Sequence, residues 1–428
     1  MRYKRNLLPG VLGTTIIWTL LAIGLPASAQ TYNVINTFSG SNGAQPLSGL
    51  IFDKLGNLYG TTSAGGLGGG VVFRLTKSGN TWTETVLYQF GSHAKDGSYP
   101  MGRLLMDGTG NLYGTTYLGG VYNAGTIYQL KRNGTSYTES VVHHFGGGND
   151  GANPTSGLVA DAAGNGYGTT YYGGTNKNCA AFGGVFSCGT VYQISAKNGV
   201  TYNVIHNFAG GRDGAFPWSD LTIDSAGHLF GETVYGGQYG KGLLYELGLS
   251  GGQWVGNPIH PWGNKDDGTY IYGGLTFDSA GNMFGVSSGG GAHGGQGTVF
   301  EFTPQGGGFL EHNLHGFGTA LDGQFPEGNL VVDAADNLFG VTHNGGAYGY
   351  GMVYAISFVQ NSWIEKVLHD FTGGNDGSTT FATLVMDSSG NLYGTTTYGG
   401  SARGCGTGPV PGCGVVFQIT GTGGKPRQ

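Results

Sequence analysis

The chain is poor in charge, in helical periodicity and in catalytic motifs. Lys, Arg, Asp and Glu make up 10% of its 428 residues, against about 25% in an ordinary globular domain. It contains no Gly-x-Ser-x-Gly nucleophile elbow, no phosphate-binding loop and no zinc-ligand spacing. Its glycine-rich runs precede strand patterns rather than helices, which excludes a dinucleotide site. No motif therefore assigns an activity, although catalytic groups assembled from separate segments leave no motif.

Residues 1–29 have the pattern of a cleaved signal peptide. Three basic residues precede an apolar run, and Ala27-Ser28-Ala29 forms a small-x-small cleavage site. An uncleaved membrane anchor is the alternative, but Pro and Gly interrupt the run. We expect a mature chain that begins near Gln30 and is secreted or periplasmic, without membrane insertion.

Removing the signal peptide lowers the net charge from −6 to −9, because it carries three positive charges and no acidic residue. A negative chain argues against nucleic acid or an anionic membrane surface as a partner. Residues 421–428 are predicted to form a flexible polar tail. We expect the mature chain to be a monomer without a cofactor or a bound metal.

Glycine, in contrast, is abundant, with 90 residues, and it falls at fixed phases of a repeat. The segment Gly56-Asn57-Leu58-Tyr59-Gly60 recurs in seven related copies. Each copy follows an Asp, and these are Asp53, Asp107, Asp161, Asp224, Asp278, Asp333 and Asp387. Asp at the first and Gly at the fourth position are typical of a type I turn, so each copy predicts a tight hairpin. In the sixth copy Asp336 replaces the turn glycine, which a left-handed position tolerates.

Each repeat predicts four strands in a meander, and no segment of the mature chain has the period of an amphipathic helix. This favours an all-β, seven-bladed β-propeller of four-stranded blades over residues 30–420, with a solenoid as the alternative. The ends of the chain favour the ring: the seventh repeat stops after its third strand, while residues 31–38 resemble the fourth strand at residues 201–208 in six of eight places. The N-terminal strand should therefore complete the last blade. A glycine inside each second strand predicts crowding by another backbone near the ring axis.

The order Asp-Gly-x-x-Pro, Leu-x-x-Asp-x-x-Gly-Asn-Leu-Tyr-Gly-Thr-Thr, Gly-Gly and Gly-Thr-Val-Tyr resembles the GloVer tandem repeat of the bacterial "choice-of-anchor" exported proteins. The resemblance covers residues 31 to 420. It implies an exported, propeller-like module and carries no established activity. We expect no C-terminal anchor of the kind found in that family, so the resemblance does not imply surface attachment.

The four cysteines lie in two long insertions between second and third strands, with Cys179 and Cys188 in the third repeat and Cys405 and Cys413 in the seventh. Cross-pairing would require Cα atoms within about 7 Å across a ring that separates these blades. We therefore predict two local disulfides, with zinc binding as the alternative.

Two polar series recur in the repeat. Five histidines stand two residues before the aromatic that ends the fourth strand: His143, His206, His260, His315 and His369. Equivalent positions in different blades do not converge on one metal, so we expect a repeated buried hydrogen bond. An acidic or amide residue also precedes Gly in each loop from fourth to first strand: Asn42, Asp96, Asp150, Asp213, Asp267, Asp322 and Asp376. Turn chemistry explains this series better than calcium binding.

Candidate sites are sought where the repeats differ, on the face that carries the fourth-to-first and second-to-third loops, here called the loop face. The candidate catalytic residues are Glu232, Glu327, Asp220, His343 and Arg103, several of which we expect at the mouth of the central channel. The candidate ligand-binding residues are Trp218, Tyr117, Tyr171, Tyr172, Tyr235, Tyr239, Tyr348 and Tyr398. Aromatic rings with a polar tip suit glycans, although packing between blades is an equal explanation for them.

The sequence thus predicts an exported, non-catalytic binding module whose partner is extracellular polysaccharide or another surface ligand. A polysaccharide lyase or hydrolase is the first alternative, and it requires the candidate acids to converge. A structural or adhesive surface protein is the second, and it predicts no pocket.

Overall fold

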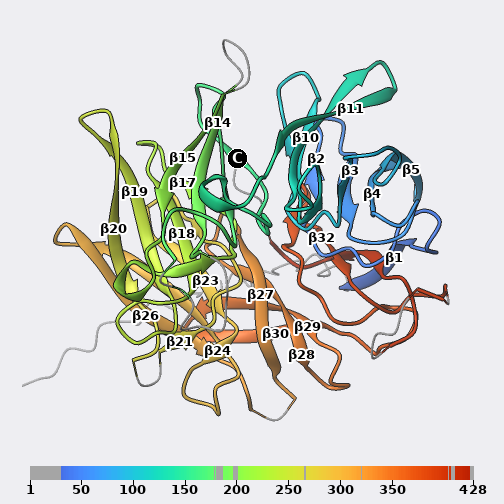
Figure 1. Cartoon of the computed structure of the whole chain (residues 1–428). Helices are drawn as coiled ribbons and strands as arrows, with labels where there is room; N and C mark the ends of the chain where they lie inside the picture. Colours follow the sequence, from blue (N-terminus) through green and yellow to red (C-terminus); the bar gives the residue numbers. More distant parts are fainter. Residues whose placement is uncertain are drawn as a thin grey trace, which may run out of the picture.

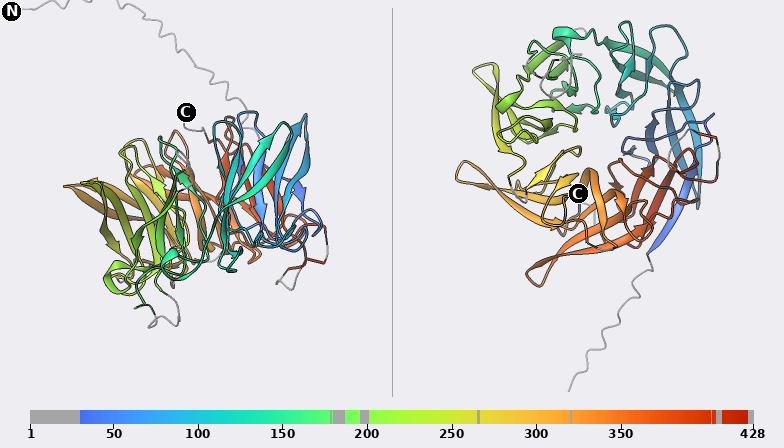
Figure 2. Two further views of the ribbon diagram at one scale, coloured as in Figure 1. Left: turned by 45° about the horizontal axis from the view of Figure 1, so that its top comes forward. Right: turned by 60° about the horizontal axis from the view of Figure 1, so that its bottom comes forward.

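The computed structural model describes residues 30–424 apart from residues 178, 180–186, 196–200, 265–266, 320, 403 and 406–409. Within these residues the chain forms seven antiparallel sheets of four or five strands, which follow one another around a ring (Figure 1 and Figure 2). The fold is a seven-bladed β-propeller, as the sequence predicts. The predicted signal peptide at residues 1–29 and the last residues of the predicted tail, 425–428, lie outside the described residues.

The blades are numbered in chain order. Blade 1 contains β2 (Ile51–Phe52), β3 (Leu58–Thr62), β4 (Val71–Ser78) and β5 (Thr81–Gln89). Blade 2 contains β7 (Leu105–Met106), β8 (Leu112–Thr116), β10 (Thr126–Asn133) and β11 (Ser136–His144). Blade 3 contains β12 (Val159–Ala160), β13 (Gly166–Thr170), β14 (Thr190–Ser195) and β15 (Thr201–Asn207). Blade 4 contains β16 (Ala215–Pro217), β17 (Thr222–Ile223), β18 (Leu229–Tyr235), β19 (Leu243–Ser250) and β20 (Gln253–Pro261).

Blade 5 contains β22 (Thr276–Phe277), β23 (Met283–Ser287), β25 (Thr298–Gln305) and β26 (Gly308–Gly316). Blade 6 contains β27 (Gly323–Val332), β28 (Leu338–Gly345), β29 (Met352–Val359) and β30 (Ser362–Asp370). Blade 7 contains β31 (Val385–Met386), β32 (Leu392–Thr396), β33 (Val415–Thr420) and β1 (Thr31–Thr37). The loops add the two-residue strands β6 (Gly97–Ser98), β9 (Leu118–Gly119), β21 (Gly268–Thr269) and β24 (Gly289–Gly290), and the 3-10 turns η1 (Gly148–Asp150) and η3 (Gly211–Asp213).

The N-terminal strand closes the ring. Strand β1 pairs antiparallel with β33, with Thr31 opposite Thr420 and Thr37 opposite Val415. In Figure 2 the N-terminal strand, in blue, lies beside the C-terminal strands, in red. Phe38 follows β1, is fully buried, and donates its backbone N–H to the oxygen of Gly414 at 3.1 Å. The outer edge of blade 7 is therefore covered by a strand from the other end of the chain, which removes an unpaired edge.

The Asp series builds the predicted hairpin turns. Asp53 Oδ1 accepts the backbone N–H groups of Leu55 and Asn57, and its Oδ2 accepts the amide of Asn57. Burial raises the pKa of Asp53, but these hydrogen bonds outweigh it, and the net pKa is lowered. Gly56 has a φ of 80°, and Asp336 takes the equivalent place with a φ of 59°. The sixth copy thus keeps the left-handed turn without a glycine.

The glycine of each second strand makes room for an aromatic ring, not for a backbone near the axis as the sequence suggested. A Cβ on Gly114 would lie 2.4 Å from the hydroxyl of Tyr128, the residue directly opposite it on β10. A ring stands opposite the glycine in every blade: Phe73, Tyr128, Tyr192, Tyr245, Phe300, Tyr354 and Phe417. The crowding is therefore local to each blade.

These rings form the core between blades. Each contacts the aromatic that ends the preceding blade, as in Phe90 with Tyr128 at 4.9 Å and Trp262 with Phe300 at 4.7 Å between ring centroids. The contact recurs at the closure, where Phe38 of blade 7 meets Phe73 of blade 1 at 5.1 Å. All seven terminal aromatics are at most 1% exposed. Seven equivalent aromatic pairs thus hold the blades in a ring, each worth about 0.5–1.5 kcal/mol beyond the area it buries.

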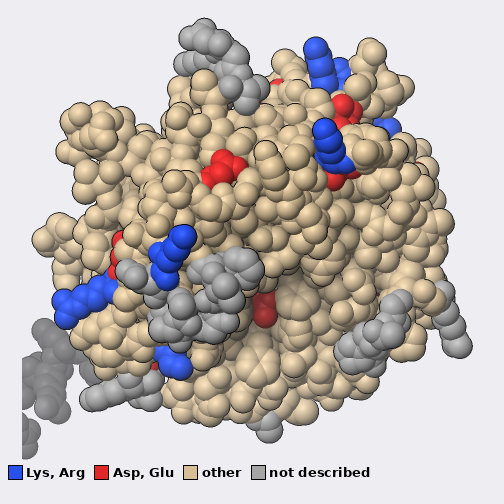
Figure 3. All heavy atoms as spheres, in the orientation of Figure 1, with Lys and Arg blue, Asp and Glu red and all other residues tan. Residues whose placement is uncertain are grey.

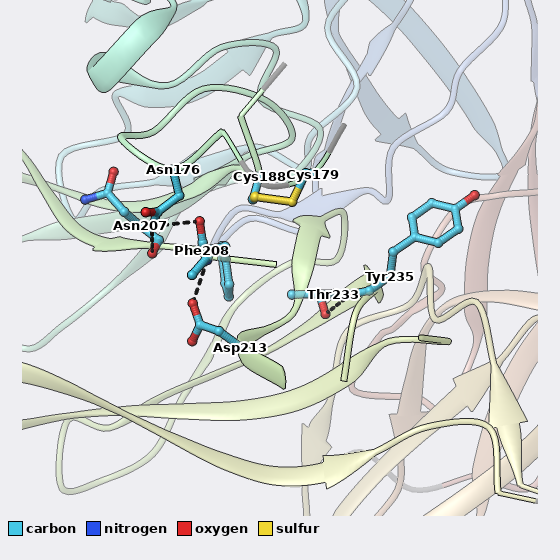
Figure 4. Close-up of a disulfide and its surroundings, with 9 residues drawn as sticks. Asn176, Cys179, Cys188, Asn207, Phe208, Asp213, Thr233 and Tyr235 are labelled. Carbon is cyan, nitrogen blue, oxygen red and sulfur yellow. Dashed lines mark hydrogen bonds between the residues drawn. A yellow bond between two sulfur atoms is a disulfide. The ribbon is translucent and has the colours of Figure 1, made fainter. Parts of the chain in front are cut away.

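Both predicted disulfides are present. Cys179 bonds to Cys188 with a Cα–Cα distance of 5.3 Å, and Cys405 bonds to Cys413 at 4.9 Å. Figure 4 shows the first bond above Phe208, whose backbone oxygen accepts the amide of Asn176 at 3.2 Å. The zinc alternative is therefore wrong for these cysteines, because their sulfurs are bonded to each other.

Candidate functional site

One left-handed residue in each blade sets the geometry of the channel mouth. These residues stand at the same phase of the fourth-to-first loop with φ between 55° and 61°: Gln45, Tyr99, Asn153, Phe216, Tyr270, Phe325 and Thr379. Each donates its backbone N–H to the preceding blade, as Tyr99 does to the oxygen of Gly69 at 2.9 Å. A proline follows the left-handed residue in five copies. Sequence reasoning missed this position, because a residue before proline is ordinarily biased towards extended backbone with a negative φ.

Two residues further along, each blade places one side chain at the mouth of the channel, and we call these seven residues the mouth ring. They are Leu47, Met101, Thr155, Trp218, Tyr272, Glu327 and Phe381. All seven line a cavity of about 350 Å³ on the loop face, here called the mouth cavity. This volume is in the range of small-molecule sites. The ring combines aromatic, aliphatic and acidic side chains, whereas the strands beneath it repeat nearly the same residues.

A second set of polar side chains lies two residues beyond the mouth ring in the sequence and lines the same cavity. Arg103, Asn329 and Thr383 line both the mouth cavity and a second cavity of about 620 Å³, whose walls come from the innermost strands. Several of these polar groups also join neighbouring blades. Asn329 Oδ1 accepts the N–H of Gly274 at 2.8 Å, and the Thr383 hydroxyl accepts the N–H of Asn329 at 2.9 Å.

Asp220 belongs to the same set and has a structural partner. Its Oδ1 accepts the N–H of Gly157, in the preceding blade, at 2.8 Å. Asp220 lines the mouth cavity, but one of its carboxylate oxygens accepts a backbone hydrogen bond. Arg103, at the equivalent position of blade 2, is half-buried, and among the described residues its guanidinium has no hydrogen bond or ion pair. Arg103 is therefore the more available of the two charged groups to a ligand.

Glu327 is the acid of the mouth ring. Burial raises the pKa of its carboxyl from 4.5 to about 8, although its side chain keeps 14% exposure to the cavity. His343 Nδ1 lies 3.9 Å from Glu327 Oε1, and burial lowers the pKa of His343. At neutral pH both side chains are thus uncharged, and the pair is polar rather than ionic. His343 lines a neighbouring cavity of about 360 Å³, which shares Glu327 and Tyr272 with the mouth cavity.

Glu232 lies apart from the other candidate acids. It is fully buried in β18 opposite Leu244, both of its carboxyl oxygens lack a hydrogen-bond partner, and it does not line the mouth cavity. Burial raises its pKa well above the ordinary value for Glu. Of the five candidates, Glu327, Asp220 and Arg103 thus line the mouth cavity, His343 lines the neighbouring cavity, and Glu232 lines neither.

The predicted ligand-binding aromatics fall into three groups. Trp218 and Tyr398 line the mouth cavity. Tyr171, Tyr172 and Tyr235 pack half-buried against the core between blades 3 and 4, and Tyr117 lies edge-on to Tyr99. Tyr239 and Tyr348 are 43% and 60% exposed on the loops. Sequence reasoning missed Tyr272 and Phe381, which only the mouth-ring phase reveals.

The aromatic side chains near the mouth contact one another. Trp218 meets Tyr272 at 5.6 Å and Tyr171 at 5.3 Å, both edge-to-face. On the other side of Glu327, His343 meets Phe381 at 4.4 Å. Burial raises the pKa of Tyr272 to about 12, so its hydroxyl stays protonated and is a donor at neutral pH. Charged side chains are sparse on the face seen in Figure 3, and acidic atoms lie at the floor of one hollow near its centre.

The two recurring polar series pair with each other where each fourth strand ends and the following loop begins, a place here called the rim of the ring. His143, His260 and His369 bond through Nε2 to the loop aspartates Asp150, Asp267 and Asp376 at 3.0–3.1 Å. The same aspartates accept backbone N–H groups of their own turns, as Asp150 does from Gly146 at 2.6 Å. The structure thus contains both the repeated histidine hydrogen bond and the turn chemistry.

No helix among the described residues is long and apolar enough to cross a membrane. The disulfides are consistent with an exported protein.

The fold and the mouth cavity define a β-propeller that presents a variable ring of side chains on a repeated scaffold. The model of the Gloeobacter/Verrucomicrobia repeat matches residues 22–182 and 178–409, and the chain belongs to that family. None of the curated proteins matches the chain.

Several solved structures are similar to the chain, each at 12% identity. A luciferin-regenerating enzyme has a TM-score of 0.46 and covers 93% of this chain and 97% of its own. A protein assigned as a gluconolactonase has a TM-score of 0.43, with coverage of 80% and 95%. A protein assigned as an oxidoreductase (glucose dehydrogenase) from Thermus thermophilus has a TM-score of 0.44, with coverage of 91% and 99%. At this identity the likeness concerns the fold alone.

Proposed function

We propose that the protein is an exported, non-catalytic binding module that holds a segment of extracellular polysaccharide in the mouth cavity. One observation carries the proposal: Trp218 and Tyr272 stand edge-to-face in the same cavity that Arg103, Asn329 and Thr383 line. Sugar rings offer apolar faces to aromatic side chains and hydroxyls to polar ones. The cavity supports this reading over a purely structural or adhesive protein, for which no pocket is required.

Export is supported by two independent features. The sequence of residues 1–29 has the charge, the apolar run and the cleavage site of a signal peptide. The two disulfides lie in loops and require an oxidising compartment to form and persist. We therefore place the mature protein in the periplasm or outside the cell.

The proposal is tested by a glycan array with the mature protein, followed by titration of any glycan that binds. Trp218→Ala should weaken binding by at least about ten-fold, because aromatic anchors in a pocket dominate recognition. Tyr348→Ala is the matched control, since Tyr348 is an exposed loop aromatic that does not line the mouth cavity. Absence of binding to every glycan, or equal affinity of wild type and Trp218→Ala, would refute the proposal.

A polysaccharide lyase or hydrolase is the second candidate, and one observation favours it. Glu327 is protonated at neutral pH and reaches the cavity, as a general acid must. An acid-base mechanism also needs a carboxylate that acts as the general base. Asp220 is a poor candidate for that role, because its Oδ1 already accepts the N–H of Gly157. Product analysis on a bound polysaccharide distinguishes the two: cleavage that Glu327→Gln abolishes while binding survives establishes the enzyme, and intact polymer establishes the binding module.

A further inference from the structure

At each blade interface, one residue of the outer strand reaches the rim of the preceding blade, where the loop aspartate lies. In blade 1 this residue is the one opposite Leu75 in the strand register, and each other blade has an equivalent position. It is Glu at four interfaces, Tyr at two and Gly at one: Glu84, Glu139, Glu311, Glu365, Tyr202, Tyr32 and Gly256. The rim of the ring therefore has one repeated geometry with different chemistry.

Where the residue is Tyr, it adds no charge to the interface, and its hydroxyl has a hydrogen-bond partner. Tyr202 stacks on His143 with ring centroids 3.9 Å apart and an interplanar angle of 6°, and its hydroxyl donates to the oxygen of Asp150 at 2.6 Å. Tyr32 stacks on His369 in the same way at 3.7 Å. The imidazole remains free to donate to its own aspartate, so no charge is left without a partner.

Where the residue is Glu facing a histidine, two carboxylates approach one imidazole nitrogen. His260 Nε2 lies 3.0 Å from Asp267 Oδ2 and 3.4 Å from Glu311 Oε2. His315 Nε2 lies 3.6 Å from Asp322 Oδ2 and 3.7 Å from Glu365 Oε2. One N–H group cannot satisfy two carboxylates, and burying a second negative charge is costly without a cation.

The interface of blades 1 and 2 repeats this arrangement with a histidine from the loop. His93 Nε2 lies 3.4 Å from Glu139 Oε2, and Asp96 completes the group. The Glu139 side chain is only 5% exposed, and its Oε1 is buried without a hydrogen-bond partner; the same is true of Asp96 Oδ1. A positive group at this place would stabilise these buried, unpartnered oxygens.

We propose that these three rim groups are binding sites for divalent transition-metal ions such as Zn²⁺: His93–Asp96–Glu139, His260–Asp267–Glu311 and His315–Asp322–Glu365. In each group one atom from every residue lies within 4.8 Å of the other two. Metal bonds of about 2.0–2.1 Å in tetrahedral geometry place ligand atoms about 3.3–3.4 Å apart, close to the 3.0–3.7 Å separations of the His260 and His315 groups. Imidazole and carboxylate are ordinary ligands of such ions.

The interface of blades 7 and 1 explains why Glu alone does not make a site. Glu84 Oε2 there accepts the amide groups of Asn36 and Asn42, at 2.9 and 2.6 Å, in place of a histidine and an aspartate. Both donors bond the same oxygen, and Glu84 Oε1 is buried without a hydrogen-bond partner, so the difference from the proposed sites lies in the missing second acid: among the described residues none is grouped with Glu84. The three proposed sites differ from it by a second carboxylate and an imidazole. Each site joins two blades, so the ion would hold neighbouring blades together at the rim.

The experiment counts ions on the untagged mature protein. The protein is stripped with EDTA, dialysed against Zn²⁺ at pH 7.5, and analysed by atomic emission. We expect three Zn²⁺ per chain for wild type, and two each for Glu139→Gln, Glu311→Gln and Glu365→Gln. Tyr202→Phe, at an equivalent position without a second acid, is the matched control and should retain three.

Each site is tested by its own single variant, so a folding defect in one variant does not affect the test of the other two sites. Each variant is first checked for an unchanged circular dichroism spectrum without metal. Zn²⁺ should also raise the melting temperature of wild type, and less in each variant, because an ion that binds only the folded state stabilises it. Two results would overturn the proposal: no Zn²⁺ above background in wild type, which would mean that a proton alone joins the carboxylates, or an ion count that the Glu→Gln changes leave unaltered.

Discussion

The carboxyl of Glu327 makes the stability of this protein depend on pH in a calculable way. Its pKa of about 8 in the folded protein compares with 4.5 for an ordinary Glu. Between pH 4.5 and 7 the unfolded chain loses this proton while the folded protein keeps it. The contribution of Glu327 to the free energy of unfolding is therefore greatest below pH 4.5 and falls as pH rises towards 8. At 1.36 kcal/mol per pH unit the loss at pH 7 is about 3 kcal/mol.

Glu327→Gln removes this dependence, because the amide does not titrate. A chain of about 400 residues has an unfolding entropy near 0.8 kcal/mol per kelvin, so about 3 kcal/mol corresponds to about 4 °C in melting temperature. Water that reaches the side chain through the mouth cavity reduces the effect, and we expect about 2 to 4 °C.

The assay is the melting temperature of wild type and Glu327→Gln at half-unit steps from pH 4.5 to 8. The melting temperature of Glu327→Gln should rise relative to that of wild type as pH rises. Glu232→Gln is the companion variant: Glu232 is fully buried away from the cavity, so its effect should have the same sign without any loss of ligand binding. A difference between wild type and Glu327→Gln that is constant from pH 4.5 to 8 would refute the argument that burial governs this carboxyl.

Three further predictions concern the scaffold. Phe38→Ala should cost about 3–5 kcal/mol, measured by denaturant unfolding, because the fully buried ring closes the propeller; a cost below about 1 kcal/mol would contradict closure by β1. Replacing Cys179 and Cys188 by Ser should cost about 2.7 kcal/mol in the chain-entropy model for a loop of about ten residues, and an unchanged melting temperature would show that the bond adds nothing. Asp220→Ala should cost about 1–3 kcal/mol by leaving the N–H of Gly157 unpaired, whereas Asp220→Asn keeps an acceptor and should cost less; equal losses would argue that the charge matters instead.

The features of the fold that the sequence predicted are those encoded by short stretches of a single repeat. The Asp-x-x-Gly turns, the strand phases and the orphan strand at residues 31–38 are encoded within single repeats, so counting them gives seven blades and a closed ring. The disulfides follow as well, because each pair lies within one loop. The second-strand glycine shows the limit of this reasoning: its crowding was predicted, but the neighbour is the ring opposite it, such as Tyr128 for Gly114.

The sequence by itself therefore determined the architecture, since turn chemistry and two-residue alternation act over a few residues. Only the tertiary structure decided which side chains meet, because neighbours at a blade interface stand about fifty residues apart in the chain. Glu232 and Glu327 are both departures from the repeat, yet one is sealed inside the protein and the other opens onto a cavity. Glu311 joins His260 and Asp267 only because the ring sets blade 5 against blade 4. Those meetings depend on the curvature of the whole ring, which no single repeat contains.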